Sequence, residues 1–154
     1  MTSAFLTILF FASIFACDQK TIESEIEEKE IMKNKNIQLV HQYFEHFNNH
    51  DWSKMADMYI DKAQFKDPTL GKTVVTQTRE EIINKYNELN TIFPDIHDEI
   101  INIYPSGDEF VIVEFISSGS AMDDSKFELP ICTIFAFKDG LITKDFSYFD
   151  NFEE

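Results

Sequence analysis

The hydrophobic pattern of the chain changes period at Pro94, and this change limits the fold more than any other feature of the sequence. Before Pro94, apolar residues recur every three or four positions, which is typical of amphipathic helices. After it they alternate, as in strands, over residues 96–104, 110–118, 127–138 and 141–149. Asp139-Gly140 joins the last two segments and is a strong hairpin signal. This order predicts an α+β domain, with helices gathered on one face of an antiparallel sheet.

Three helices are expected before Pro94. The first starts at Asn36 and carries an apolar stripe of Ile37, Val40, Phe44 and Phe47. The second is capped by Asp51 and carries Trp52, Met55 and Tyr59 on one face. The third opens on a Thr78–Glu81 capping box and continues with Ile82, Tyr86, Leu89 and Phe93. A short extended segment over 63–68, ended by Pro68, separates the second helix from the third.

The N-terminal segment has a different character from the rest of the chain. Residues 4–17, AFLTILFFASIFAC, are apolar but too short for a stable membrane span, and they fit the hydrophobic region of a signal peptide. The end of this segment, Ile14-Phe15-Ala16-Cys17, resembles a bacterial lipobox. The resemblance implies that residues 1–16 are removed and that Cys17 becomes a lipidated, membrane-anchored N-terminus. A plain secretory signal, or a short helix with a chance cysteine, is the alternative.

Residues 17–35 follow as a charged tether, rich in Glu and Lys, which reads as a linker or a solvated helical lead-in. The domain then covers 36–154. The net charge of −15 argues against nucleic acid as a partner, because phosphates attract basic patches.

The order of elements and several short signatures resemble the NTF2-like superfamily, in its SnoaL-like branch. The signatures are Val40-His41-Gln42-Tyr43-Phe44, Asn49-His50-Asp51-Trp52, Phe65-Lys66-Asp67-Pro68, Phe93-Pro94-Asp95 and Lys138-Asp139-Gly140-Leu141-Ile142. The resemblance implies a cone, in which three N-terminal helices pack on a curved antiparallel sheet around an interior pocket. Relatives include isomerases, cyclases, hydrolases and non-enzymatic binding modules, so the function has to be argued from the site.

Three acids are the candidate catalytic residues. Glu114 interrupts an apolar strand face with Phe110 and Ile112, which the resemblance assigns to the pocket side; alternatively, strand curvature takes it to solvent. Asp67 precedes Pro68 at a position that the resemblance assigns to the pocket mouth, and it is equally suited to forming a turn. Asp145 matches a position where relatives often carry His or another polar residue. Such carboxylates gain basicity when they are desolvated.

The expected ligand-binding residues are aromatic. The apolar stripes predict that several of them line one cavity: Tyr43, Phe47, Trp52, Tyr86, Phe110 and Phe135. His46 and His50 have a spacing that suits a metal, but no third ligand is evident, so neither a metal nor another cofactor is expected. Cys132 lies opposite the Phe-rich strand face and reads as a packed side chain.

The strand at 110–118 is apolar on both faces, whereas a sheet with one wet face should alternate. Large exposed apolar patches usually mark interfaces, and NTF2-like relatives often dimerise through the outer sheet face. We therefore expect a symmetric homodimer that buries Val113, Phe115 and Ile134.

These features predict an envelope-anchored bacterial lipoprotein, or a secreted or periplasmic protein, that binds a small apolar molecule or a partner in its pocket without defined catalysis. The alternative is a SnoaL-like isomerase, cyclase or hydrolase that uses pocket carboxylates for proton transfer. Two titratable groups within hydrogen-bond distance deep in the pocket would favour the enzyme.

Overall fold

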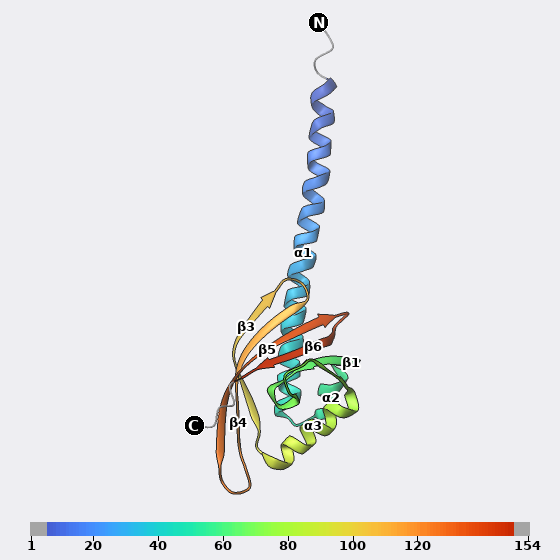
Figure 1. The fold of residues 1–154 in the computed structure, drawn as a ribbon. Helices are drawn as coiled ribbons and strands as arrows, with labels where there is room; N and C mark the ends of the chain where they lie inside the picture. Colours follow the sequence, from blue (N-terminus) through green and yellow to red (C-terminus); the bar gives the residue numbers. More distant parts are fainter. Residues whose placement is uncertain (1–5, 150–154) are drawn as a thin grey trace.

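The computed structural model describes the backbone of residues 6–149 and the side chains of residues 22–149. The helices are α1 (Leu6–Asn48), α2 (Trp52–Asp57) and α3 (Arg79–Ile92), with a single 3₁₀ turn, η1 (Pro68–Leu70). The strands are β1 (Tyr59–Lys66), β2 (Val75–Thr78), β3 (His97–Ser106), β4 (Phe110–Ser120), β5 (Lys126–Lys138) and β6 (Leu141–Tyr148). The α+β class and the helices packed on a curved sheet are confirmed (Figure 1).

The sheet has six strands in the order β2-β1-β6-β5-β4-β3. β1 runs parallel to β6, whereas every other neighbouring pair is antiparallel, so the expectation of a purely antiparallel sheet is wrong. After β2 the chain passes through α3, forms β3, β4 and β5 in turn, and returns with β6 beside β1. Because this long connection separates β1 from β6, the two strands can run parallel. The sequence also gave no signal for β2, a four-residue edge strand with no buried residue.

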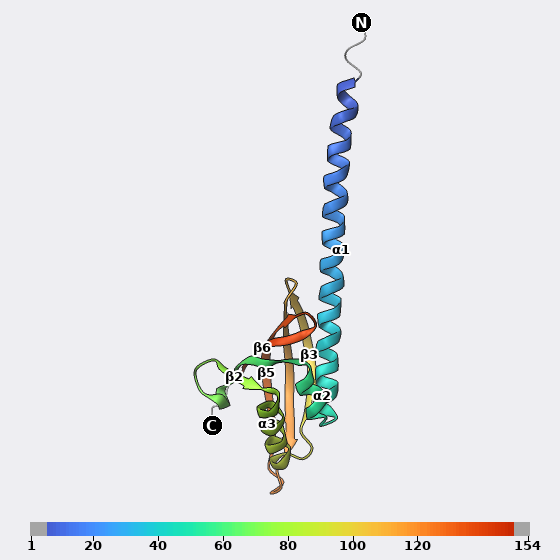
Figure 2. The ribbon, with the colours of Figure 1, turned by 90° about the vertical axis from the view of Figure 1, so that its right-hand side faces the viewer.

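The first helix is much longer than its apolar stripe. Among its described side chains, from residue 22 on, the buried ones lie in the C-terminal part, namely Asn36, Val40, Tyr43, Phe44 and Phe47. This part of α1 packs on β3 and β4. Asn36 fixes the point where the helix meets the domain, because its Nδ2 donates to the Asp108 carbonyl at 2.9 Å. Residues 22–32 are exposed, and the N-terminal part of α1 projects away from the sheet in both views (Figures 1 and 2). The tether of residues 17–35, expected to be a linker or a solvated helical lead-in, is helical in the structure.

α1 runs without a break through the expected boundaries at residues 16 and 35. The side chains of 4–17, including Cys17, lie outside the described residues, so lipidation and cleavage stay predictions. Within the described part of the chain, no helix is both long and apolar enough to cross a membrane.

The predicted starts of the second and third helices are confirmed, whereas the first helix begins well before Asn36, and Tyr59, expected on the second helix, instead begins β1. Asp51 caps α2 by accepting from the Lys54 backbone N–H at 3.2 Å. Thr78 and Glu81 form the full capping box of α3, with the Glu81 carboxylate 2.7 Å from the Thr78 backbone nitrogen. α3 ends at Ile92, and its C-cap residue Phe93 directly precedes Pro94. Asp139 and Gly140 have φ of 53° and 81°, as the two-residue hairpin requires.

The two faces of β4 are the reverse of the expectation. The face that meets the helices, here called the inner face, carries Val111, Val113 and Phe115, each buried in the core. The opposite or outer face carries Ile112 and Glu114. The register with β5 decides this, because Val111 lies opposite Phe135 and Val113 lies opposite Thr133, and directly paired residues share a face. Val113 and Phe115 therefore cannot form the proposed dimer surface.

Candidate functional site

A cavity of about 790 Å³ lies between α1, α3 and the inner face of β3 to β6. Four of the six expected ligand-binding aromatics line it: Tyr43, Phe47, Tyr86 and Phe135. Trp52 is buried one layer behind, stacked on the Tyr86 ring at 5.5 Å between centroids. Phe110 is 37% exposed on the outer face, so its expected place in the cavity is wrong. The size and the aromatic wall suit a small organic molecule.

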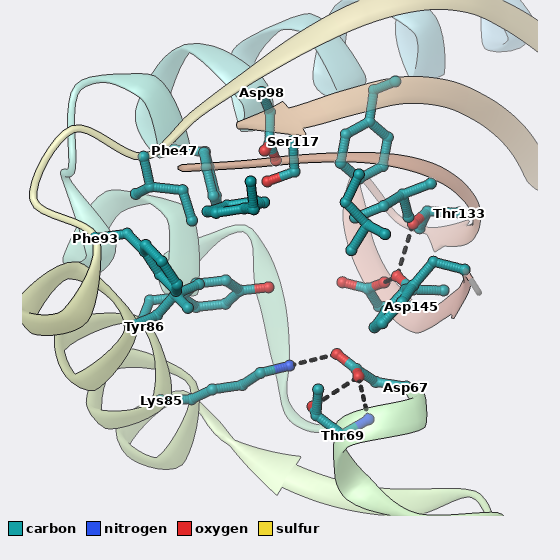
Figure 3. Close-up of a pocket in the computed structure, with 18 of the residues that line it drawn as sticks. Phe47, Asp67, Thr69, Lys85, Tyr86, Phe93, Asp98, Ser117, Thr133 and Asp145 are labelled. Atoms are coloured by element: carbon teal, nitrogen blue, oxygen red, sulfur yellow. Dashed lines mark hydrogen bonds and ion pairs between the residues drawn. The ribbon is translucent and has the colours of Figure 1, made fainter. Parts of the chain in front are cut away.

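Asp145, from β6, contributes a buried carboxyl group to the cavity wall (Figure 3). Its Oδ2 accepts from the Tyr59 hydroxyl at 2.6 Å, and its Oδ1 lies 3.4 Å from the Ser147 hydroxyl. Burial raises the pKa of Asp145 to about 6, and the Tyr59 hydroxyl and the Lys85 ammonium oppose this rise. A carboxyl group with such a pKa can hold or release a proton near neutral pH. Asp145 lies on the inner face of β6 because it is paired in register with the buried Phe135 of β5.

Asp67 is held in its ionised form at the side of the cavity (Figure 3). It caps η1 by accepting from the Thr69 backbone N–H and hydroxyl at 2.8 and 2.7 Å, and it pairs with the Lys85 ammonium at 2.7 Å. Although burial opposes ionisation, Lys85 and Thr69 together lower the pKa of Asp67. The pKa of Lys85 is raised despite burial, through Tyr86 and Asp67. Asp67 thus has both predicted roles: it forms the turn and it lines the cavity.

Asp98, from β3, is a second buried carboxyl group of the cavity beside Asp145, and it was not among the sequence candidates. Its side chain lies beside Ser117 of β4, with which it is paired in register (Figure 3). Burial raises the pKa of Asp98 to about 7, against the effect of the Ser117 hydroxyl, and its Oδ1 has no hydrogen-bond partner. The alternation of Ile96, Asp98 and Ile100 on one face was the signal that could have identified it.

Three tyrosines surround these acids from different elements. Tyr43 from α1 and Tyr86 from α3 have hydroxyl oxygens 3.5 Å apart, and the Tyr43 and Tyr59 rings lie edge to face at 6.2 Å. Burial raises the pKa of all three well above the ordinary value, so they stay neutral phenols. Figure 3 shows the Tyr86 hydroxyl pointing across the cavity towards Asp145. The wall therefore offers neutral O–H groups beside proton-exchanging carboxyls.

Glu114 does not reach the cavity. It lies exposed on the outer face, where its Oε2 accepts from Asn102 Nδ2 at 2.9 Å and from the Tyr104 hydroxyl at 3.1 Å. The expected placement of Glu114 on the pocket side is wrong for the same reason as that of Phe110: both share the outer face of β4. Cys132, its partner in register, also lies on that face, opposite the Phe-rich row as predicted.

Of the two helix-end histidines, His50 has a structural role. His50 stacks on Trp52 at 5.2 Å between ring centroids, and its Nε2 lies 2.9 Å from the Ile96 carbonyl oxygen. These contacts lock the α1–α2 corner against the start of β3.

The comparisons with known proteins agree with this geometry. The model of the SnoaL-like domain matches residues 40–144. The chain belongs to this family. The match contains Asp67 and Asp98 and ends one residue before Asp145. Among curated protein sequences, none matches this chain.

Solved structures with the same fold are distant in sequence. A protein of ketosteroid isomerase-like fold from Catenulispora acidiphila, in complex with trimethylamine, has 19% identity and a TM-score of 0.65, over 73% of this chain and 85% of its own. The epoxide hydrolase/cyclase-like enzyme SalBIII, of pyran ring formation in salinomycin, has 18% identity and a TM-score of 0.67, over 77% and 92%. An NTF2-like protein from Anabaena variabilis has 18% identity and a TM-score of 0.66, over 77% and 91%. At such identities the likeness shows the fold alone.

Proposed function

We propose that this SnoaL-like domain binds a small, mainly apolar molecule in the inner-face cavity. The observation that carries the proposal is the combination of volume and wall: about 790 Å³, lined by aromatic rings and by a few polar groups. Binding sites for small molecules are typically clefts of roughly 300–1,000 Å³ with this composition. The polar groups are fixed by their own contacts, Asp67 by Lys85 and Asp145 by Tyr59, so they can orient a ligand.

Two tryptophan substitutions on the same strand test the binding proposal. Leu129 lines the cavity from the inner face of β5, whereas Ile134 lies on the outer face of the same strand. The neutral probe 4-phenylbutan-1-ol, titrated into the full chain by calorimetry, should bind to the wild type and to Ile134→Trp. Leu129→Trp should lose most of this binding, because the indole occupies the cavity. Equal binding to both variants, or none to the wild type, would overturn the proposal.

A second candidate function is proton transfer on the bound molecule. The observation that favours it is the Tyr59–Asp145 pair, two buried titratable groups joined at 2.6 Å, of which Asp145 lines the cavity. A carboxyl group whose pKa is about 6 is mainly ionised at neutral pH and retains more basicity than a solvated aspartate. It is therefore suited to abstracting a proton from carbon next to a carbonyl group, and the neutral phenols are suited to donating to the carbonyl oxygen.

Exchange of the α-protons of 4-phenylbutan-2-one in D₂O, followed by NMR, tests this candidate. The wild type should accelerate exchange by at least about tenfold over buffer. Asp145→Asn should remove the acceleration, and Glu114→Gln, which changes an acid on the outer face, should retain it. If wild type and Asp145→Asn exchange the protons equally fast, proton transfer by Asp145 is wrong.

We further propose that the domain is held at the bacterial cell envelope by lipid on Cys17. The apolar segment 4–17 and its lipobox-like end support this, and the exposed, charged residues 22–32 of α1 would form a spacer between membrane and domain. Cys17→Ala should move the protein from the membrane fraction to the soluble fraction. An intact mass without lipid on the native protein would contradict the proposal.

A further inference from the structure

The cavity wall is strongly acidic for a mainly apolar site. Five of the residues that line it are acids, and the described lining contains a single basic side chain, Lys85. The acids are Asp67, Glu88, Asp98, Glu128 and Asp145. Lys85 is already paired with Asp67 at 2.7 Å, so it does not neutralise the others. The charge of the whole chain, −15, adds a field of the same sign.

Asp98 is the buried acid in this wall with one carboxyl oxygen left without a partner, while Ser117 interacts with the carboxyl group. Its side chain is 5% exposed, yet its Oδ1 has no hydrogen-bond partner and no described basic side chain pairs with it. Asn48 contacts the backbone of Asp98 through two hydrogen bonds, at 2.8 and 2.9 Å, and these fix the strand without satisfying the carboxyl group. A buried carboxylate in this state is costly unless a cation or a donor reaches it.

The buried Asp145 and the half-buried Asp67 differ from Asp98 in this respect. Asp145 accepts from the Tyr59 hydroxyl, and Asp67 has its ammonium ion and two donors from Thr69. Among the buried carboxyl groups of the described cavity wall, only that of Asp98 has an oxygen without a hydrogen-bond partner. Aromatic rings from the surrounding elements line the same cavity, among them those of Tyr43, Phe47, Tyr86 and Phe135.

We infer that the bound molecule carries a protonated amine, which pairs with Asp98 while its apolar body lies among the aromatic rings. The inference rests on the proposed binding function and names its ligand class. An ammonium group supplies both a positive charge and an N–H donor for the Asp98 oxygen that lacks one. Aromatic faces also attract cations, which adds to the preference over a neutral molecule of the same shape.

Three probes with one body and three head groups test the inference on the full chain at about pH 8, where an alkyl amine is protonated. These are 4-phenylbutylamine, 4-phenylbutan-1-ol and 4-phenylbutyrate. Calorimetric titration should give the amine at least about tenfold higher affinity than the alcohol, and the carboxylate the weakest binding of all. Asp98→Asn should reduce the affinity for the amine to nearly that for the alcohol, with the alcohol unchanged.

Two control variants separate pairing with Asp98 from general attraction to an acidic protein. Glu114→Gln removes one negative charge from the outer face and should leave the amine-to-alcohol ratio unchanged. Glu128→Gln removes a charge from an exposed acid that lines the cavity while leaving Asp98 in place, and it should retain most of the preference. Thermal unfolding of each variant checks that it is folded, which is expected because Asn and Gln keep the shapes of the side chains they replace.

The outcomes distinguish this inference from the proposed function. If the alcohol binds and the amine binds no more tightly, the ammonium inference is wrong and cavity binding stands. A preference for the amine that Asp98→Asn does not reduce also overturns the inference. If none of the three probes binds to the folded wild type, the proposed binding function fails and the inference fails with it.

Discussion

Carboxyl groups on the two faces of the sheet have opposite environments. On the inner face, Asp98 and Asp145 are buried in a cavity wall, and burial raises the pKa of each carboxyl group, to about 7 and about 6. On the outer face, Glu114 is exposed and accepts from two polar side chains of the neighbouring strand, Asn102 and Tyr104. The difference lies in strand alternation, because neighbouring residues of a strand point to opposite faces. A displacement by one residue therefore separates a candidate functional carboxyl from a solvated one.

The largest expected effect comes from placing a charge on each face of β4. Val113→Glu buries a carboxylate in the core without a partner and should cost about 3 kcal/mol or more in the free energy of unfolding. Ile112→Glu places the same group on the outer face, beside Tyr104 in the register, and should leave the domain folded. Chemical denaturation of both variants measures the contrast. Equal destabilisation would contradict the assignment of the faces.

Ile112→Glu also tests the assembly prediction in its corrected form. The outer face keeps exposed or half-exposed apolar residues, among them Ile101, Phe110 and Tyr148, so we propose that a homodimer would form there rather than through Val113 and Phe115. Sedimentation of the lipid-free domain should show a dimer that Ile112→Glu shifts towards monomer. A monomeric wild type at high concentration would exclude this interface.

An effect of intermediate size is expected from Asp98→Asn, and its sign depends on pH. The pKa of Asp98 is about 7 in the folded protein and 3.8 in its ordinary state. Between these values the folded protein binds a proton that the unfolded chain has released, so the free energy of unfolding falls as the pH rises. Asp98→Asn removes this part of the decrease in the free energy of unfolding with rising pH. It should stabilise the protein by on the order of 3 kcal/mol at about pH 8 and hardly at all at about pH 4.

Denaturant unfolding of wild type and Asp98→Asn across this range measures the effect. The groups that act on the Asp98 carboxyl in the described structure are the Ser117 hydroxyl and the neutral Tyr43, so no neighbouring group is expected to titrate with it. A difference that is constant with pH would show that Asp98 is not buried in the way the structure has it. The matched change on the outer face, Glu114→Gln, should shift stability by less than about 0.5 kcal/mol.

The smallest expected effect is the difference in unfolding cost between losing a buried and an exposed tyrosine–carboxylate hydrogen bond. Tyr59→Phe removes the buried donor to Asp145 and should cost about 1–3 kcal/mol at neutral pH, with a further rise in the pKa of Asp145. Tyr104→Phe removes the exposed donor to Glu114 and should cost about 0.5 kcal/mol or less. Unfolding measurements give the costs, and NMR titration of the Asp145 carboxyl follows its pKa. A larger cost at Tyr104 would reverse the comparison.

Local signals predicted most of the fold. The Thr78 capping box, the Asp139-Gly140 turn and the stripe of Val40, Phe44 and Phe47 depend on neighbours in the sequence, and each has the expected structure. The faces of β4 depend on pairing with β5, since Ile112 and Val113 are equally apolar, and alternation alone does not distinguish them. The parallel β1–β6 pair depends on long-range contacts as well.

The candidate site was predictable to a similar degree. Asp67 and Asp145 were identified from the resemblance and line the cavity. Glu114 was expected in the cavity because the inner and outer faces of β4 were assigned the wrong way round. Asp98 was not singled out, although it occupies an inner position between Ile96 and Ile100. Its partnerless oxygen depends on what packs around it, which only the folded structure shows.

A crystal structure of the full chain with 4-phenylbutylamine tests the central claim most directly, because it shows which face of the sheet receives the ligand. The account predicts the ammonium nitrogen within hydrogen-bond distance, about 2.7–3.2 Å, of the Asp98 carboxyl, with the phenyl ring in the cavity between Tyr86 and Phe135. An amine seated on the outer face beside Glu114, with the inner cavity closed by its own side chains, would contradict it.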